Sequence, residues 1–134
     1  CKYGIPKLIE RGGGIIINTA SIAALRGGAD AHAYTASKGA ILALTRAVAV
    51  TYGPKGIRAN TLCPGVIDTE MIHDALIDNS GISETLARST PLKRNGTPEE
   101  VADVALFLAS DQSRFVTGEA FAVDGGIIQS IGLS

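Results

Sequence analysis

Three short apolar runs along the chain predict β-strands. Residues 15–17 (III) are β-branched throughout, which is typical of a strand buried on both faces of a sheet. Residues 57–63 (IRANTLC) and residues 119–123 (EAFAV) form the other two runs. The second run is stopped by the sequence PG and the third by DGG, because proline and glycine favour turns. We therefore expect three strands.

Three longer segments predict helices around these strands. Residues 1–11 are helix-like and end in three glycines, which commonly stop a helix. Residues 34–52 form a strong helix that ends at the sequence GP. Thr97 begins the third helix as its N-cap, with a proline at the first helical position and a glutamate at the third. This helix should run to about Ser110.

The resulting order is helix, strand, helix, strand, loop, helix, strand. Such alternation predicts an α/β domain with a parallel sheet, helices on both faces and right-handed crossovers. Residues 18–33 are mostly small and polar, and we expect them to form a loop. Residues 66–97 have no clean period and contain several turn residues, so a lid or binding loop is expected there.

Composition narrows the class of protein. The 134 residues make one domain at most, and 46% hydrophobic with 19% charged residues fits a soluble globular protein. A net charge of -1, without basic runs, provides no electrostatic basis for binding nucleic acid. The apolar stretches fall far short of the roughly 20 residues that a membrane helix needs, and no signal peptide is visible. Two cysteines do not make a disulfide scaffold, so a cytoplasmic protein without a membrane partner is expected.

The predicted helix at residues 34–52 is apolar on nearly every side. Its stretch GAILALTRAVAV contains a single charged residue, Arg46. A helix on the surface of a monomer normally has a polar stripe, so we expect burial on two sides, by the sheet and by another subunit. Gly39, Ala43 and Ala47 would let a second helix approach closely. The helix therefore predicts a homodimer or homotetramer, with burial inside one larger domain as the alternative.

Two tyrosine–lysine pairs have the i, i+4 spacing that places both side chains on one helix face: YTASK at 34–38 and YGIPK at 3–7. The first pair has polar groups around it. The strand at residues 15–17 runs into Ser21, and the helix with YTASK begins at the same edge of the sheet. The second strand ends at that edge in PGVIDT, residues 64–69. Three segments are thus expected to meet in one crevice.

The pair Tyr3–Lys7 lacks this context. No strand end precedes it, and no serine is placed to join it. Pro6 lies between the two residues and disfavours a helical conformation at Ile5. We interpret this pair as a surface coincidence.

The expected crevice suits proton transfer on an alcohol. A tyrosine hydroxyl, with an unperturbed pKa of about 10, is a poor base at neutral pH, but a lysine ammonium one turn away favours the phenolate. Such a phenol can pass a proton to or from an alcohol oxygen while a serine hydroxyl holds that oxygen. This chemistry is useful when a hydride leaves the alcohol carbon for a nicotinamide. Ser21, Tyr34 and Lys38 are therefore candidate catalytic residues.

Five stretches of the sequence resemble, in their order, the C-terminal half of a short-chain dehydrogenase/reductase. They are NTAS at 18–21, YTASK at 34–38, IRANTLCPGVIDT at 57–69, PLKRNGTPEEVA at 91–102 and VTGEAFAVDGG at 116–126. The resemblance covers essentially the whole chain. It implies the C-terminal half of a Rossmann-like doubly wound parallel sheet, with three of its seven strands and their flanking helices. It also implies an NAD- or NADP-dependent oxidoreductase that interconverts a secondary alcohol and a ketone.

The resemblance implies roles for the matching residues. Tyr34 would be the acid/base, Lys38 would favour its phenolate and bind the nicotinamide ribose, and Ser21 would position the substrate oxygen. The nicotinamide side would be lined by Pro64, Gly65, Ile67 and Thr69. Residues 70–97 would be the substrate lid. Its apolar residues would line the substrate pocket or merely pack the lid, and they include Met71, Ile72 and Leu76.

The family's dinucleotide-binding signatures do not occur in this sequence. The TGxxxGxG turn, the residue that selects NAD or NADP, the NNAG stretch and the catalytic asparagine are all missing. The three glycines at 12–14 precede a strand, so they are not a phosphate loop. The sequence also begins with Cys1 in a helix-like segment, which suggests a fragment or a processed chain without the N-terminal dinucleotide-binding half. We expect the chain alone to bind dinucleotide poorly, to turn over slowly or not at all, and to leave the strand at 15–17 with an open edge.

Two other interpretations fit parts of the sequence. A truncated, non-catalytic half-fold could act as a dimerising or binding module. A different α/β enzyme with Ser21 as its nucleophile is disfavoured, because the sequence has no GxSxG elbow and no clearly placed histidine. Cys63 is interpreted as a buried strand residue, His32 and His73 as solvent-facing, and no spacing suggests a metal site. The sequence leaves open the substrate and the choice between NAD and NADP.

Overall fold

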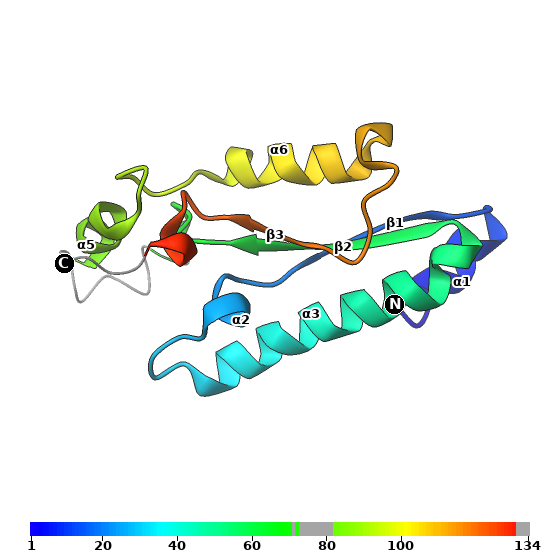
Figure 1. The fold of residues 1–134 in the computed structure, drawn as a ribbon, viewed down its shortest axis with the longest axis horizontal. Helices are drawn as coiled ribbons and strands as arrows, with labels where there is room; N and C mark the ends of the chain where they lie inside the picture. Colours follow the sequence, from blue (N-terminus) through cyan, green and yellow to red (C-terminus); the bar gives the residue numbers. More distant parts are fainter. Residues whose placement is uncertain (71, 73–81, 131–134) are drawn as a thin grey trace.

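A three-stranded parallel sheet organises the computed structural model, which describes residues 1–70, 72 and 82–130. The strand order is β1-β2-β3, with β1 at Gly14–Thr19, β2 at Ile57–Pro64 and β3 at Ala120–Val123 (Figure 1). Gly14 pairs with Ile57 at the start of β1, and Pro64 pairs with Val123 at the end of β2. β2 is central and is buried along most of its length. The three predicted strands and their parallel arrangement are thus confirmed.

Helices cover both faces of this sheet. The long helix α3 (His32–Tyr52) and the short α1 (Gly4–Glu10) lie on one face, and α6 (Pro98–Ala109) lies on the other (Figure 1). The remaining helical segments are α2 (Ala23–Arg26), α5 (Ile82–Ser89) and three short 3₁₀ turns, η1 (Gly53–Lys55), η2 (Asp111–Ser113) and η3 (Ile127–Gln129). None of the helices in these described ranges has the length and apolarity that crossing a bilayer requires.

Two clusters of buried side chains hold α3 on the sheet. The larger cluster joins α1 and the end of α3 to β2, through Ile5, Val48, Ala49, Ile57 and Ala59. The smaller cluster lies at the carboxyl ends of the strands, and it consists of Ala20, Leu42 and Cys63. Burial of such apolar side chains is the main force that fixes a helix against a sheet. The smaller cluster therefore sets the position of the first half of α3, which carries Tyr34 and Lys38.

α1 forms within the predicted helix-like segment 1–11, although Pro6 disfavours a helical conformation at Ile5. α1 runs through both residues, and Ile5 is only 6% exposed. Pro6 is the third residue of α1, where a backbone N–H has no intrahelical acceptor, so its missing donor costs little. Ile5 also gains contacts with Val48 and Ala49 in the larger cluster. Tertiary burial therefore outweighs the local preference before a proline.

Residues 18–33 and 66–97 contain more regular structure than expected. β1 extends to Thr19, and α2 forms in the predicted loop that follows it. α3 begins at His32 rather than at residue 34. α5 lies inside the second segment, and its 8 residues are fewer than the window over which a helical period can be recognised. Short helices of this kind depend on tertiary contacts, which explains why the sequence did not reveal them.

The start of α6 agrees with the prediction in detail. Thr97 is the N-cap, its hydroxyl accepts a hydrogen bond from the Glu100 backbone N–H, and the Glu100 carboxylate accepts one from the Thr97 N–H. Pro98 occupies the first turn, where its missing donor is tolerated.

β1 is an outer strand of the sheet. Among the described residues it pairs with β2 alone.

Candidate active site

The carboxyl ends of β1 and β2 form the base of the candidate site. Hydrogen bonds continue past the end of β1, from the Ala20 N–H to the Leu62 carbonyl at 2.7 Å and from the Ile22 N–H to the Pro64 carbonyl at 3.1 Å. Ser21 lies between these two bonds. Its backbone is therefore fixed beside the end of β2, where open α/β sheets commonly bind ligands.

A cavity of about 450 Å³ opens at this edge of the sheet. It is lined by every described residue that the sequence predicted for the site: Ser21, Tyr34, Lys38, Pro64, Gly65, Ile67, Thr69 and Ile72. Two other lid residues predicted for the pocket, Met71 and Leu76, lie outside the described residues, as does His73. Four further lining residues were not predicted, Thr19, Ala20, Pro98 and Val101. The structure thus brings the three predicted segments and a fourth one, at the start of α6, to one cavity.

Tyr34 and Lys38 lie together on the first turns of α3. The Lys38 ammonium nitrogen is 5.6 Å from the centroid of the Tyr34 ring, within the usual range of a cation–π contact. Tyr34 is 50% exposed and Lys38 is half-buried, so a ligand can reach the phenol while the ammonium stays close to it. This placement keeps a positive charge beside the phenol.

Ser21 is half-buried and is oriented by the start of α2. Its hydroxyl oxygen accepts a hydrogen bond from the Ala23 N–H at 3.2 Å. This bond uses one of the two acceptor positions of the hydroxyl, whose proton can still be donated to a ligand. A substrate oxygen in the cavity could therefore be held by Ser21.

A polar contact between β1 and α3 was not predicted. The Asn18 amide donates to the Thr45 hydroxyl at 2.8 Å, and that hydroxyl donates to the Ile41 carbonyl at 2.8 Å. Thr45 is fully buried. Because Asn18 is on the strand that leads to Ser21, this contact fixes α3 relative to that strand.

The segment 64–69, which we call the PGVIDT loop, is paired with a second segment rather than free. Ile67 is opposite Gly96 in an isolated parallel bridge. The Gly96 N–H donates to the Val66 carbonyl at 3.0 Å, and the Asp68 N–H donates to the Gly96 carbonyl at 2.9 Å. The Thr69 hydroxyl bonds the Ile67 carbonyl at 3.4 Å. The loop is therefore held on the side away from α3.

Cys63 clusters with Ala20, which lines the cavity, and it is completely buried, as predicted. Burial raises the pKa of its thiol, although the Ser21 backbone and the Arg46 charge act in the opposite direction. A thiol in this environment is a poor nucleophile. Cys63 is therefore part of the packed core.

The remaining candidates lie away from the cavity. Tyr3 is 81% exposed, and the Lys7 ammonium bonds the Glu10 carboxylate at 2.8 Å. His32 is exposed at the start of α3. The described residues include no group of three or more histidine, cysteine or acidic side chains that could hold a metal ion.

Comparisons with known proteins agree with this geometry. A family model described as Enoyl-(Acyl carrier protein) reductase matches residues 1–128. The chain is 43% identical over 129 residues to the 2-(S)-hydroxypropyl-CoM dehydrogenase 3 of Xanthobacter autotrophicus, covering 94% of this chain and 51% of that protein.

Solved structures are similar as well. A short-chain type dehydrogenase/reductase from Mycobacterium ulcerans has a TM-score of 0.89 and 34% identity, over 98% of this chain and 47% of that one. A gluconate 5-dehydrogenase from Burkholderia cenocepacia, solved with NADP and tartrate, has a TM-score of 0.88 and 37% identity, over 94% of this chain and 49% of that one. The chain spans about half the length of the curated relatives it matches. By sequence, fold and the residues at the strand ends, the chain belongs to the short-chain dehydrogenase/reductase family.

Proposed function

We propose that the cavity at the strand ends is the alcohol side of an NAD- or NADP-dependent active site that interconverts a secondary alcohol and a ketone. The observation that supports this most directly is the convergence of Ser21, Tyr34 and Lys38 with the PGVIDT loop in one cavity. A serine hydroxyl, a phenol and an ammonium are sufficient to bind an alcohol oxygen and move its proton. Membership of a family of dehydrogenases and reductases supports the same reaction.

The residues present fit the nicotinamide end of such a cofactor. Pro64 and Ile67 supply an apolar wall, Thr69 a hydroxyl and Lys38 a cation that can bind ribose hydroxyls. The bound nicotinamide would accept the hydride from the alcohol carbon or return it to the ketone. The relative from Burkholderia cenocepacia, solved with NADP, supports a cofactor of this class.

Three side chains would carry the proton chemistry. Ser21 donates a hydrogen bond to the substrate oxygen and stabilises the charge that develops there. Tyr34 takes the alcohol proton at its phenolic oxygen during oxidation and returns it during reduction. Lys38 stabilises the phenolate form of Tyr34 by its positive charge.

Residues 70–97 are proposed as the substrate lid over this cavity. Ile72 supports the proposal, because it lines the cavity from within that segment. We also propose a homodimer or homotetramer through α3, whose outer face exposes Leu44 and Val50. The protein is proposed to act on a small alcohol or ketone in the cytoplasm.

Replacement of Tyr34 by phenylalanine tests the proposed reaction. In the longest natural form of the protein, Tyr34→Phe removes only the phenolic oxygen. Oxidation of secondary alcohols with NAD or NADP should slow by about 10²- to 10⁴-fold, because proton transfer loses its partner. Absorbance of the reduced nicotinamide at steady state measures the rate, and circular dichroism checks that the fold survives.

Tyr3→Phe is the matched control, since Tyr3 is exposed and distant from the cavity. It should leave the rate unchanged. If Tyr34→Phe is as active as the parent, or if the parent oxidises and reduces no alcohol or ketone, the proposal is wrong. The non-catalytic half-fold would then be the better description.

A further inference from the structure

We propose that Arg94 and Glu100 are positioning residues that hold the PGVIDT loop in its cofactor-binding conformation. The proposal rests on the proposed function, in which that loop faces the nicotinamide. Neither side chain lines the active-site cavity. Their effect would pass through Gly96, which lies between them in the chain and pairs with the loop.

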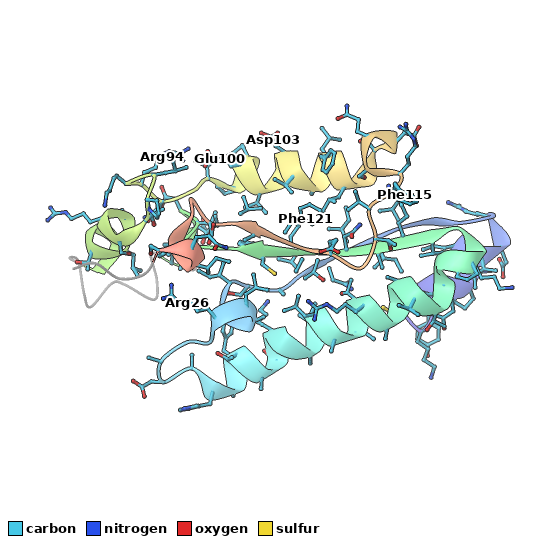
Figure 2. All side chains as sticks on the ribbon, in the orientation of Figure 1. Arg26, Arg94, Glu100, Asp103, Phe115 and Phe121 are labelled. Carbon is cyan, nitrogen blue, oxygen red and sulfur yellow. The ribbon has the colours of Figure 1, made fainter. Side chains whose placement is uncertain are left out.

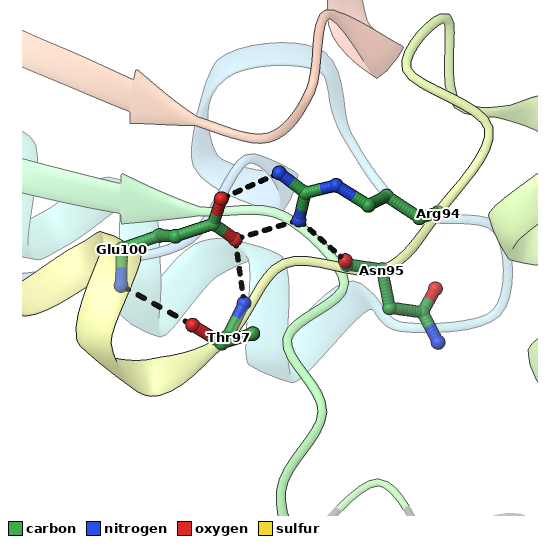
Figure 3. Close-up of polar contacts among 4 residues, drawn as sticks. All are labelled: Arg94, Asn95, Thr97 and Glu100. Atoms are coloured by element: carbon green, nitrogen blue, oxygen red, sulfur yellow. Dashed lines mark hydrogen bonds and ion pairs between the residues drawn. The ribbon is translucent and has the colours of Figure 1, made fainter.

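The two side chains form a two-pronged ion pair at the start of α6 (Figures 2 and 3). The Arg94 guanidinium donates to both Glu100 carboxylate oxygens, at 2.8 Å and 2.5 Å, and also to the Asn95 carbonyl at 3.1 Å. One of those carboxylate oxygens accepts the Thr97 N–H at 2.9 Å. Such a bidentate pair constrains direction as well as distance. The backbone from Arg94 to Thr97 is therefore closed into a small ring by Glu100.

Gly96 connects this ring to the PGVIDT loop. Its N–H and carbonyl bond Val66 and Asp68, on either side of Ile67. A Cβ on Gly96 would lie 2.8 Å from the Ile67 terminal methyl carbon, so the two segments are in close contact. Ile67 itself lines the active-site cavity. A shift of the ring would thus move Ile67 and the following Thr69, which the proposed function places beside the nicotinamide.

Because the Arg94–Glu100 pair is exposed, its removal should change the position of the loop more than the stability of the whole fold. The side chains of Arg94 and Glu100 are 53% and 40% exposed, and surface ion pairs contribute little to the free energy of unfolding. The chain offers a matched pair, Lys7 and Glu10 on α1, which is also exposed and bonded at 2.8 Å. That pair has no link to the cavity. A difference between the two pairs in cofactor binding would therefore report on the loop.

The test compares Arg94→Met, Glu100→Gln and their double variant in the longest natural form of the protein. Glutamine at this position can still accept the Thr97 N–H, so the cap of α6 is retained while the ion pair is lost. NADH and NADPH are each titrated by fluorescence. We expect each single variant to raise the Kd of the preferred dinucleotide by on the order of tenfold, because the loop that faces the nicotinamide is then less well ordered before binding. The double variant should be no worse than either single one, since both remove one interaction.

Glu10→Gln and Tyr34→Phe complete the test. Glu10→Gln should leave the Kd unchanged, and all variants should keep a Tm close to that of the parent. Unchanged dinucleotide affinity in Arg94→Met and Glu100→Gln, or additive losses in the double variant, would overturn the positioning role. A Tm loss that accompanies the rise in Kd would also overturn it, because the effect would then be general. If Tyr34→Phe abolishes turnover in the same series, the proposed function stands whichever of these results is found.

Discussion

One cavity is lined by Ser21, which follows the end of β1, and by Tyr34 and Lys38 on the first turns of α3. The same Tyr–Lys spacing occurs at Tyr3 and Lys7, where the phenol is exposed and the ammonium pairs with Glu10. Spacing on a helix places two groups together but does not bring a third group to them. The two pairs differ in their surroundings, because only Tyr34 and Lys38 lie at the edge of the sheet where Ser21 is also found.

The Glu100 carboxyl should titrate far below its ordinary range. Hydrogen bonds from Arg94 and then from the Thr97 N–H lower the pKa of Glu100 from 4.5 to about 2. Because the pKa is depressed in the folded state, the contribution of the pair is complete above pH 4.5 and is lost as the pH falls through 2. Carboxyl carbon shifts followed by NMR across this pH range measure the midpoint.

Arg94→Met should move that midpoint of Glu100 up toward 4.5, since the largest cause of the shift is removed. Lys7→Met removes an ion pair on α1 and should leave the midpoint where it is. A carboxyl of Glu100 that already titrates near 4.5 in the parent protein would contradict the bidentate geometry.

Helices and strands differ in how well the sequence predicted them. The three strands and the capped start of α6 were predicted because their signals are local: β-branched runs, proline, glycine and the capping residues. α2 and α5 were missed because tertiary contacts decide them, and such contacts also outweigh the local preference of Ile5 before Pro6.

The residues of the candidate site also divide into those with a local sequence signal and those brought there by tertiary contacts. Ser21, Tyr34 and Lys38 could be predicted because they lie at strand and helix ends that are legible in the sequence. Pro98 and Val101 in the cavity wall could not, since they come from the far side of the sheet. The pairing of Gly96 with the PGVIDT loop was likewise invisible, because it joins two irregular segments.

The exposed face of α3 should govern the oligomeric state. Leu44 is 50% exposed and Val50 is 80% exposed, and Ala43 and Ala47 are exposed between them. An arginine at Ala47 would place a charge in an apolar helix–helix contact that leaves no room for it. Light scattering after size-exclusion chromatography should then give a smaller assembly for Ala47→Arg than for the parent.

Ala109→Arg is the comparison variant, because Ala109 is an exposed residue at the end of α6, on the other face of the sheet. It should keep the mass of the parent, and circular dichroism should show that both variants remain folded. An unchanged assembly mass for Ala47→Arg would show that α3 does not form the subunit interface.

The glycines at 12–14 are not placed as a phosphate-binding turn would be. They lead into β1 rather than out of a strand, whereas the proposed alcohol-binding cavity lies at the carboxyl ends of the strands. The chain also spans about half the length of its curated relatives.

The purified 134-residue chain should consequently bind NADH and NADPH weakly. Fluorescence titration against the longest natural form provides the comparison, with circular dichroism to confirm that the shorter chain is folded. The family's phosphate-binding turn does not occur in this sequence, so little of the cofactor's binding energy is expected, and little turnover even with excess cofactor. Equal affinity in the two forms, with both folded, would show that these 134 residues suffice.

Alkylation of the buried Cys63 thiol can report on motions next to the cavity. Cys1 is exposed and Cys63 is completely buried, so an alkylating reagent can reach the first at once and the second only when the strand ends separate from α3. The rate at which Cys63 is alkylated then measures how often the structure opens locally next to Ser21. A molecule that binds in the cavity would slow the alkylation of Cys63. Candidate substrates could therefore be ranked by this rate, without a turnover assay and without an optical signal from the ligand.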